Sequence, residues 1–374
     1  MRPGKPGTIL LALCALAAAM PLVAGARAGR TTVNAALRPP QPLAAADLTR
    51  RQLAGQRIVC GFDGSSAPAS LLRVIAAGEL AGVILFDDNI GSKAAVQRLT
   101  GAIQATDRPV GLRQPVLISI DQEGGQVKRL PGPPKMSAAE MGRRGAATAR
   151  SQGAATGASL ASYGVNVDLA PVLDVARPGG FIAEQQRSFG SKPGRVGAAG
   201  AAFAEGLESG GIAATAKHFP GLGSTSANTD LRPATIPLSA KTLRRVDIAP
   251  YESFVAAGGD LVMVGSARYP ALGTGKLPAS QSKSVMNREL RGTLGFTGVT
   301  VTDSLETPSI RRSGSAAKVA VRTAGAGADL LLYVHCDAGM RAAKALRRGL
   351  ADGKLKRGPF EAAVDRVLGL RASL

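Results

Sequence analysis

The chain has 374 residues, which is long for an ordinary domain and normal for one α/β barrel. Apolar residues make up 45% of it, enough for a sizeable core, so the composition excludes an intrinsically disordered chain. The formal net charge of +20 favours anionic surroundings, such as envelope polymers or nucleic acid. Because the basic residues are scattered and aromatic residues make up only 3%, we expect no nucleic-acid partner.

The N-terminus has the three parts of a secretory signal. Basic residues within the first five positions precede an apolar run over 8–23, and a small-residue cleavage site, Ala26-Arg27-Ala28, follows. We predict a signal peptide over 1–28, with an uncleaved anchor helix as the alternative. Residues 29–47 are rich in Ala and Pro and are predicted to be a linker. We therefore expect an exported protein, either extracellular or associated with the cell envelope.

Eight short apolar runs, rich in Val, Ile and Leu and without strict alternation, recur along the rest of the chain. Such runs are typical of buried parallel strands. They lie at 57–62, 82–86, 116–120, 165–169, 212–216, 260–265, 298–302 and 329–334. Helical patterns accompany them at 69–77, 93–106, 143–163, 194–209, 315–327, 338–351 and 357–370. The alternation predicts a single (β/α)₈ TIM-type barrel over 48–374, with a doubly wound sheet as the structural alternative.

In such a barrel, functional side chains lie where strands end and loops begin. Polar residues gather at these points, although a purely structural barrel needs none of them there. They are Asp121, Gln122, Glu123, Lys128 and Arg129 after the third strand, Asp168 and Asp174 near the fourth, Lys217 and His218 after the fifth, and Asp303, Ser304 and Glu306 after the seventh. Their joint placement predicts an active site at one rim of the barrel.

Five ordered motifs resemble glycoside hydrolase family 3. They are Ile120-Asp121-Gln122-Glu123-Gly124-Gly125, Leu169-Ala170-Pro171-Val172-Leu173-Asp174-Val175, Arg187-Ser188-Phe189-Gly190, Lys217-His218-Phe219-Pro220-Gly221 and Thr302-Asp303-Ser304-Leu305. The single-domain length resembles the bacterial β-N-acetylhexosaminidase branch, which trims N-acetylglucosamine from peptidoglycan fragments. The resemblance implies a retaining hydrolase of terminal β-linked N-acetylglucosamine that needs no cofactor.

The resemblance also implies roles for individual residues. Asp303 would be the nucleophile that forms a covalent glycosyl intermediate. Asp121 would accept hydrogen bonds from sugar hydroxyls, and four basic side chains would hold the sugar that is cleaved off, which are those of Arg129, Arg187, Lys217 and His218. Carboxylates and cations bind vicinal hydroxyls well, so the physical logic agrees.

One departure from the family pattern concerns proton transfer. In the β-N-acetylhexosaminidase branch, a His on the loop after Lys-His-Phe-Pro-Gly serves as acid/base. This chain has two histidines, His218 and His335, and neither lies on that loop. Asp230 stands in the place of the missing His, 13 residues after Lys217, and is our candidate acid/base, with capping of a loop as the alternative role.

Three further functions stay open at this point. The first is a β-glucosidase-type hydrolase of the same family, and the second is a sugar-binding pseudo-enzyme that has lost its acid/base. The third is a basic protein that binds the cell envelope through its charge. The widely spaced histidines and cysteines provide no metal-ligand spacing, so we expect no metal. The expected partners are glycans that contain N-acetylglucosamine, together with anionic envelope polymers attracted by the positive charge.

Cys60 and Cys336 are the cysteines outside the predicted signal peptide. Export would allow them to oxidise, and closure of a barrel brings its first and eighth strands together. A disulfide between them is a hypothesis, and two reduced, buried cysteines are the alternative.

Overall fold

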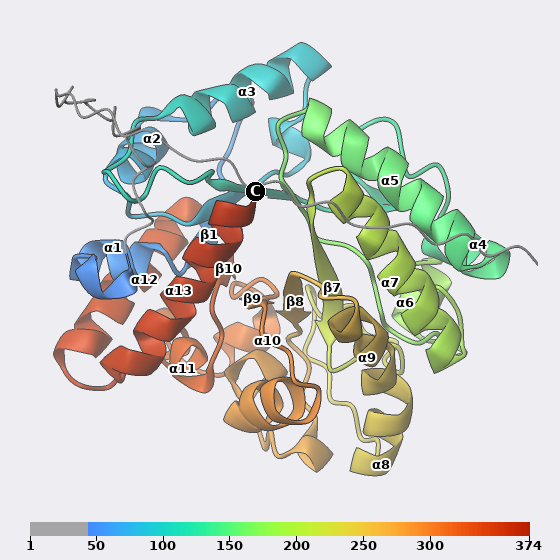
Figure 1. Ribbon diagram of the computed structural model, residues 1–374. Helices are drawn as coiled ribbons and strands as arrows, with labels where there is room; N and C mark the ends of the chain where they lie inside the picture. The colour runs from blue at the N-terminus through green and yellow to red at the C-terminus, as the bar shows by residue number, and fades with distance from the viewer. Residues whose placement is uncertain (1–43) are drawn as a thin grey trace, which may run out of the picture. The chain divides into compact units, whose positions relative to one another are not determined.

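Eight parallel strands follow one another around a closed circuit in the computed structural model, which describes residues 44–374 (Figure 1). Each strand pairs with the next one along the chain, and β10 pairs back with β1, where Ile58 lies opposite Leu331. A bridge between Val301 and Leu330 links β9 to β10. The strands are β1 (Ile58–Cys60), β2 (Gly82–Ile84), β3 (Leu117–Ile120), β6 (Val167–Asp168), β7 (Ala213–Phe219), β8 (Leu261–Val264), β9 (Val299–Thr302) and β10 (Leu331–Tyr333). The predicted (β/α)₈ barrel is confirmed, and each strand overlaps a predicted apolar run. The run over 212–216 is too short, because β7 continues to Phe219 and includes Lys217 and His218.

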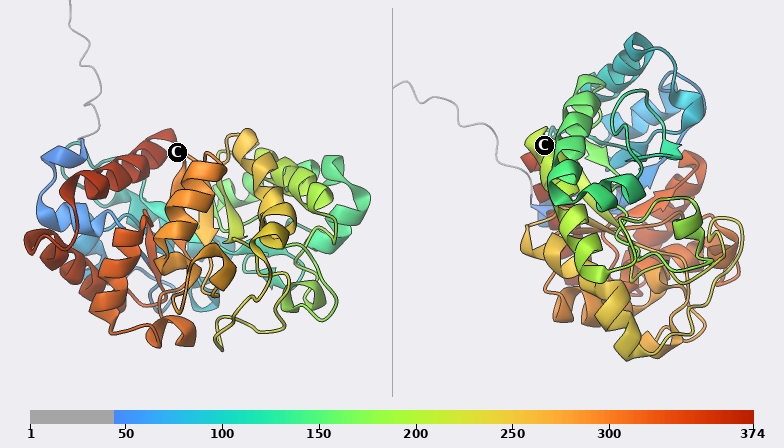
Figure 2. Two further views of the ribbon diagram at one scale, coloured as in Figure 1. Left: turned by 90° about the horizontal axis from the view of Figure 1, so that it is seen from below. Right: turned by 90° about the vertical axis from the view of Figure 1, so that its right-hand side faces the viewer.

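Helices form an outer layer around these strands (Figure 2). They are α1 (Arg50–Gly55), α2 (Ala69–Ala76), α3 (Lys93–Ala105), α4 (Ala138–Arg144), α5 (Ala146–Ser162), α6 (Phe181–Glu184), α7 (Pro193–Ser209), α8 (Ala240–Thr242), α9 (Ala249–Ala256), α10 (Pro308–Arg311), α11 (Ala316–Ala326), α12 (Cys336–Ala351) and α13 (Arg357–Ser373). Short 3₁₀ turns are η1 (Ala45–Asp47), η2 (Asp87–Asn89), η4 (Pro270–Leu272) and η5 (Ala279–Gln281), and η3 (Leu243–Ile248) and η6 (Ser284–Thr293) are π-helical. A hairpin of β4 (Gln122–Gly124) and β5 (Val127–Lys128) follows β3.

Gly145 divides one of the helices that the sequence predicts. The pattern over 143–163 predicts one helix, whereas the chain ends α4 at Arg144 and begins α5 at Ala146. Gly145 between them has φ 97°, a left-handed conformation that glycine adopts at little cost and that interrupts a helix.

Side chains alternate between two apolar layers. Val59 points into the barrel, while its neighbours Ile58 and Cys60 join the core between strands and helices. Val367 and Leu370 of α13 belong to the same interior cluster as Val59. The barrel is thus a packed core, as this fold requires, and α13 contributes to it.

The predicted signal peptide over 1–28 lies outside the described residues, and so does most of the predicted linker. Ala45, at the end of that linker, is fully buried, and its amide donates a hydrogen bond to the Asp365 carboxylate at 2.8 Å. Within residues 44–374, no helix combines the length and the apolar character needed to cross a membrane.

A disulfide joins Cys60 at the end of β1 to Cys336 at the start of α12, with 4.9 Å between their Cα atoms. This bond confirms the disulfide hypothesis. The two cysteines lie close together because β1 and β10 are neighbours in the closed barrel. The bridge spans 276 positions of the sequence and therefore closes a very long loop of the unfolded chain.

We expect the double variant Cys60→Ala/Cys336→Ala to lose about 2–5 kcal/mol of unfolding free energy, because an open unfolded chain has more conformations than a cross-linked one. Urea titration measures this loss. Thiol titration before and after reduction is the control. Identical urea midpoints for the variant and the oxidised wild type would contradict the expectation.

Asp168, at the end of β6, is a fully buried carboxyl group. Its Oδ1 accepts a hydrogen bond from the Gln122 amide at 3.0 Å, whereas its Oδ2 has no hydrogen-bond partner among the described residues. Burial is the largest cause that raises the pKa of Asp168, which reaches about 8. A raised pKa means that the folded state retains a proton that the unfolded chain has released.

The stability contributed by Asp168 is therefore complete below the ordinary carboxyl pKa and is lost as the pH rises toward about 8. We expect Asp168→Asn, which cannot ionise, to unfold at nearly the wild-type temperature at pH 5. At pH 8.5 it should be more stable than the wild type by roughly 1–3 kcal/mol. Thermal unfolding across this pH range measures the difference, and parallel curves for the two proteins would contradict it.

Candidate active site

A cavity of about 510 Å³ lies at the carboxyl ends of the strands. Its apolar lining includes Ile84, Leu169, Met263 and Leu332, which also belong to the interior core of the barrel. Polar side chains line the rest of the cavity. All seven site residues predicted from the sequence are among them, namely Asp121, Arg129, Arg187, Lys217, His218, Asp230 and Asp303. The fold thus brings together residues that lie up to 182 positions apart in the chain.

Lys217 on β7 is the centre of a buried ion-pair cluster. Its Nζ donates hydrogen bonds to Asp121 Oδ1 at 2.6 Å and to Glu123 Oε1 at 2.7 Å. Arg187 binds the same Glu123 carboxylate with two parallel hydrogen bonds of 2.7 and 2.8 Å. Only 3% of the Lys217 and Glu123 side chains is exposed, so these charges are stabilised by one another and not by water.

The pKa values in this cluster reflect that dependence. Burial alone would raise the pKa of Glu123, but the Lys217 and Arg187 charges outweigh it and lower this pKa to about 2. Burial would likewise lower the pKa of Lys217, yet the carboxylates of Asp121 and Glu123 raise it above its usual value. Glu123 and Lys217 are therefore both ionised at neutral pH.

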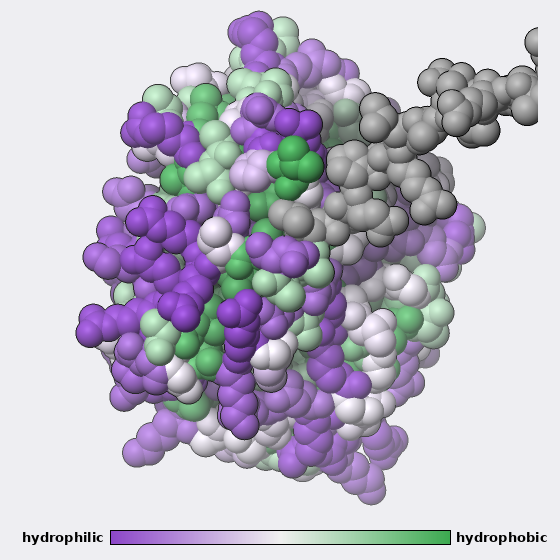
Figure 3. All heavy atoms as spheres, turned by 60° about the vertical axis from the view of Figure 1, so that its left-hand side comes forward, coloured by the Kyte–Doolittle hydropathy of each residue, from purple (hydrophilic) through white to green (hydrophobic). Residues whose placement is uncertain are grey.

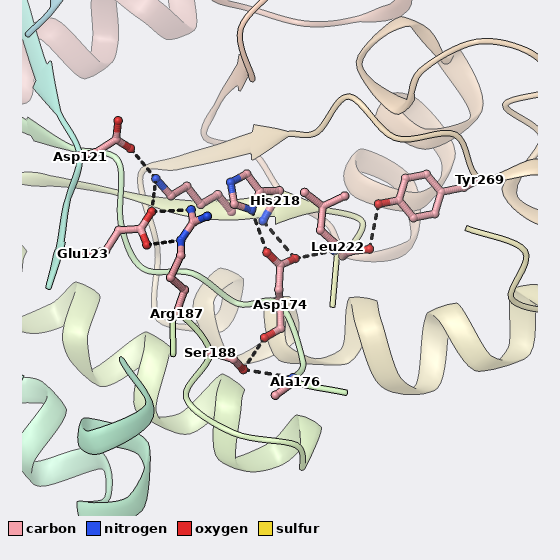
Figure 4. Close-up of polar contacts among 11 residues, drawn as sticks. Asp121, Glu123, Asp174, Ala176, Arg187, Ser188, His218, Leu222 and Tyr269 are labelled. Carbon is pink, nitrogen blue, oxygen red and sulfur yellow. Dashed lines mark hydrogen bonds and ion pairs between the residues drawn. The ribbon is translucent and has the colours of Figure 1, made fainter. Parts of the chain in front are cut away.

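His218 is held by a second buried carboxylate, that of Asp174. The His218 Nδ1 lies 2.8 Å from Asp174 Oδ2, and Asp174 Oδ1 accepts a hydrogen bond of 2.6 Å from the Leu222 amide (Figure 4). Asp174 is fully buried. With Nδ1 bound to a carboxylate, the ring orientation is fixed and Nε2 is the nitrogen left to bind a ligand.

Asp303 follows β9 directly at the wall of the cavity. Its amide donates to the Val264 carbonyl at 3.0 Å, and its Oδ1 accepts from the Ser304 amide at 2.8 Å. Burial, followed by the negative charge of Asp230, raises the pKa of Asp303 to about 6, while the His218 and Lys217 charges oppose the rise. At neutral pH this carboxylate is therefore mostly ionised, as a nucleophile must be.

Asp230 and Arg129 lie at the open side of the cavity. Asp230 is exposed on the loop between β7 and α8, and its amide donates to Asn228 Oδ1 at 2.9 Å. Arg129 follows β5, and its Nη1 donates to Asp87 Oδ2 at 2.8 Å. The Arg129 side chain is 28% exposed and lines the cavity, so it stays within reach of a ligand.

Sequence reasoning did not assign a role to Glu123 or to Asp174. Both lie inside the family motifs, but their partners are distant in the chain, since Glu123 pairs with Arg187 and Asp174 with His218. The available signal was chemical, because an acidic residue within an apolar motif needs a counter-charge or hydrogen-bond donors. Within the described residues no group of histidine, cysteine and acidic side chains could hold a metal ion.

Comparison with known proteins identifies the family. The chain matches the model of the glycosyl hydrolase family 3 N terminal domain over residues 57–370. It is 36% identical over 330 residues to an uncharacterized secreted glycosyl hydrolase of Arthroderma benhamiae, a match that covers 86% of this chain and 93% of the relative.

Two solved structures are similar. One is a family 3 β-N-acetylglucosaminidase from a Paenibacillus species, with a TM-score of 0.79, 33% identity, and coverage of 87% of this chain and 63% of that one. The other is a β-N-acetylhexosaminidase from Beutenbergia cavernae, with a TM-score of 0.76, 30% identity, and coverage of 87% and 99%. The resemblance expected from the motifs is confirmed, and the chain belongs to glycosyl hydrolase family 3 as a glycoside hydrolase that acts on carbohydrate.

Proposed function

We propose that the protein is a retaining exo-β-N-acetylglucosaminidase that removes terminal β-linked N-acetylglucosamine from peptidoglycan fragments or related glycans. The observation that carries this proposal is the placement of two carboxylates, Asp303 and Asp230, in one cavity beside a fixed cluster of hydrogen-bonding charges. The choice of sugar is supported by the two similar structures, which are a β-N-acetylglucosaminidase and a β-N-acetylhexosaminidase.

The ion-pair cluster holds the sugar. Asp121 accepts hydrogen bonds from its hydroxyl groups, and Lys217, Arg187 and His218 donate to its oxygens, while Arg129 closes the open side. Because Glu123 and Asp174 already fix three of these donors, they need no rearrangement when the sugar binds. Such preorganisation directs binding energy toward orienting the anomeric carbon against Asp303.

Asp303 attacks the anomeric carbon, forming a covalent bond as the bond to the leaving oxygen breaks. Asp230 gives its proton to that oxygen and thereby releases the aglycone, the group on the far side of the bond. Asp230 then takes a proton from water, whose oxygen attacks the anomeric carbon and frees Asp303. Each residue ends the cycle in the state in which it began.

A sugar-binding pseudo-enzyme is the second candidate, and the missing loop histidine favours it. The two histidines, His218 and His335, both lie outside the loop between β7 and α8, so no imidazole on this loop can deliver the proton. A β-glucosidase-type activity uses the same cavity with another sugar. A panel of nitrophenyl glycosides distinguishes these functions, since a pseudo-enzyme binds N-acetylglucosamine without releasing nitrophenol.

We also propose that the protein is exported and meets anionic envelope polymers. The signal-like N-terminus and the word secreted in the name of the Arthroderma relative support export. Hydrophilic side chains predominate on the face shown in Figure 3, and Arg341, Lys344 and Arg348 are exposed on α12. Such a surface binds polyanions with an affinity that falls as salt is added.

We expect Asp303→Asn to lower turnover of nitrophenyl β-N-acetylglucosaminide by at least about 1,000-fold, because an amide is a very poor nucleophile. Burial raises the pKa of Asp303, so removing its charge should leave the melting temperature at pH 7 unchanged or higher. Wild-type kcat/KM should fall as the pH drops below about 6. A fluorinated sugar should label Asp303 in the wild type, and substantial activity in the variant would exclude this nucleophile.

Asp230→Ala should separate the two chemical steps. With a poor leaving group, such as a second sugar, we expect a loss of about 100-fold or more, because proton delivery limits the rate. With nitrophenol, which leaves without a proton, bond cleavage should persist, and azide should restore release by attacking the intermediate in place of activated water. Ser226→Ala, on the same loop but outside the lining of the cavity, is the matched control. Equal losses on both substrates without azide rescue would make Asp230 a structural residue.

A further inference from the structure

A second cavity, of about 240 Å³, adjoins the active-site cavity. It lies between α2 and the start of α12, and its apolar side chains include Phe62, Leu71, Val74 and Met340. A mostly apolar hollow with a few polar groups at its edge is the usual form of a small-molecule site. His335 lines both cavities, so the two meet at this side chain.

His335 is fixed by a carboxylate from the active site. Its ring Nδ1 lies 3.1 Å from Glu306 Oε1, and its backbone amide donates to Glu306 Oε2 at 3.0 Å. Both carboxylate oxygens are thus used to orient one residue. The Glu306 side chain is only 17% exposed, whereas 61% of the His335 side chain remains exposed. The imidazole therefore presents an open face where the two cavities meet, and its Nε2 has no hydrogen-bond partner among residues 44–374.

The wall that carries His335 is cross-linked. The next residue, Cys336, forms the disulfide with Cys60, and its amide donates to the Gly61 carbonyl at 2.8 Å. Gly61 and Cys336 both line the second cavity. This part of the surface is consequently held in a defined shape. A binding site requires a defined shape, whereas an incidental gap between helices does not.

We propose that the second cavity binds the distal part of the aglycone, which leaves the active site across the Glu306–His335 pair. The apolar lining selects an apolar group at that end, and the carboxylates of Asp63 and Asp337 disfavour a negative charge there. Among the glycans that the proposed function covers, the second cavity then favours an N-acetylglucosaminide with an amphiphilic, uncharged aglycone over an acidic peptidoglycan fragment. Such an aglycone is polar near the glycosidic bond and apolar farther away. This assignment rests on the proposed function for the identity of the sugar.

The test compares the methyl and octyl 1-thio-β-N-acetylglucosaminides, which carry the same sugar and resist hydrolysis. Calorimetry on the full chain measures both dissociation constants. We expect the octyl compound to bind at least about tenfold more tightly to the wild type, since burial of two methylene groups gives such a factor. His335→Ala should reduce this advantage, because the tail crosses that side chain.

Ser70→Phe and Ala76→Phe provide a matched pair. Both positions are exposed on α2, but Ser70 lines the second cavity and Ala76 does not. A phenyl ring at position 70 should fill the cavity and reduce the octyl advantage to less than about threefold, with methyl binding unchanged. The same ring at position 76 should leave the advantage intact.

Turnover of nitrophenyl β-N-acetylglucosaminide by the wild type is measured in parallel and reports on the proposed function. Turnover together with equal affinity for the two thioglycosides would overturn the aglycone site alone. An octyl advantage that Ser70→Phe leaves unchanged would also overturn it. Absence of turnover with an octyl advantage that Ser70→Phe abolishes would support the site and contradict hydrolysis.

Discussion

The buried ammonium group of Lys217 is the constraint on which the site depends. A cation with 3% exposure cannot be hydrated, so it requires carboxylates at hydrogen-bonding distance, and Asp121 and Glu123 provide them. Glu123 in turn binds Arg187, which ties the loop before α7 to the ends of β3 and β7. Removing either partner would leave a buried charge uncompensated, so the cluster fixes the relative positions of these three segments. The proposed sugar site is rigid because folding already demands this arrangement.

The same charges create the field in which Asp303 operates. Burial and the Asp230 carboxylate raise its pKa, and His218 and Lys217 oppose the rise. Asp121 and Glu123 neutralise much of the Lys217 charge, and without them the cation would act more strongly on Asp303. As a result, the Asp303 carboxylate is ionised near neutral pH, but its negative charge is less stabilised than that of an exposed carboxylate. A less stabilised charge favours nucleophilic attack.

The barrel could be predicted from sequence because buried parallel strands have a short apolar signature, and because the carboxyl ends of such strands meet at one rim. The same rule predicted that Asp121, Lys217 and Asp303 lie close together. Pairings over long separations, such as Asp174 with His218, have no local signal. Glycines are equally ambiguous, since a Cβ at Gly206 would lie 2.3 Å from the Arg150 carbonyl oxygen where α7 packs on α5. The sequence shows the glycine but not the neighbouring helix that requires it.

The arrangement of Asp303 and Asp230 bears on how a family 3 enzyme could work without a loop histidine. Asp303 lies at the rigid end of β9, whereas Asp230 is exposed on a loop at the open side. A nucleophile must meet one anomeric carbon in one geometry, while the proton donor must serve leaving groups that differ in size. Since the Asp230 charge contributes to the raised pKa of Asp303, a proton on Asp230 would lower that pKa and favour the ionised nucleophile. The Lys217 charge also favours the ionised form of Asp303, which is the form that attack on the anomeric carbon requires.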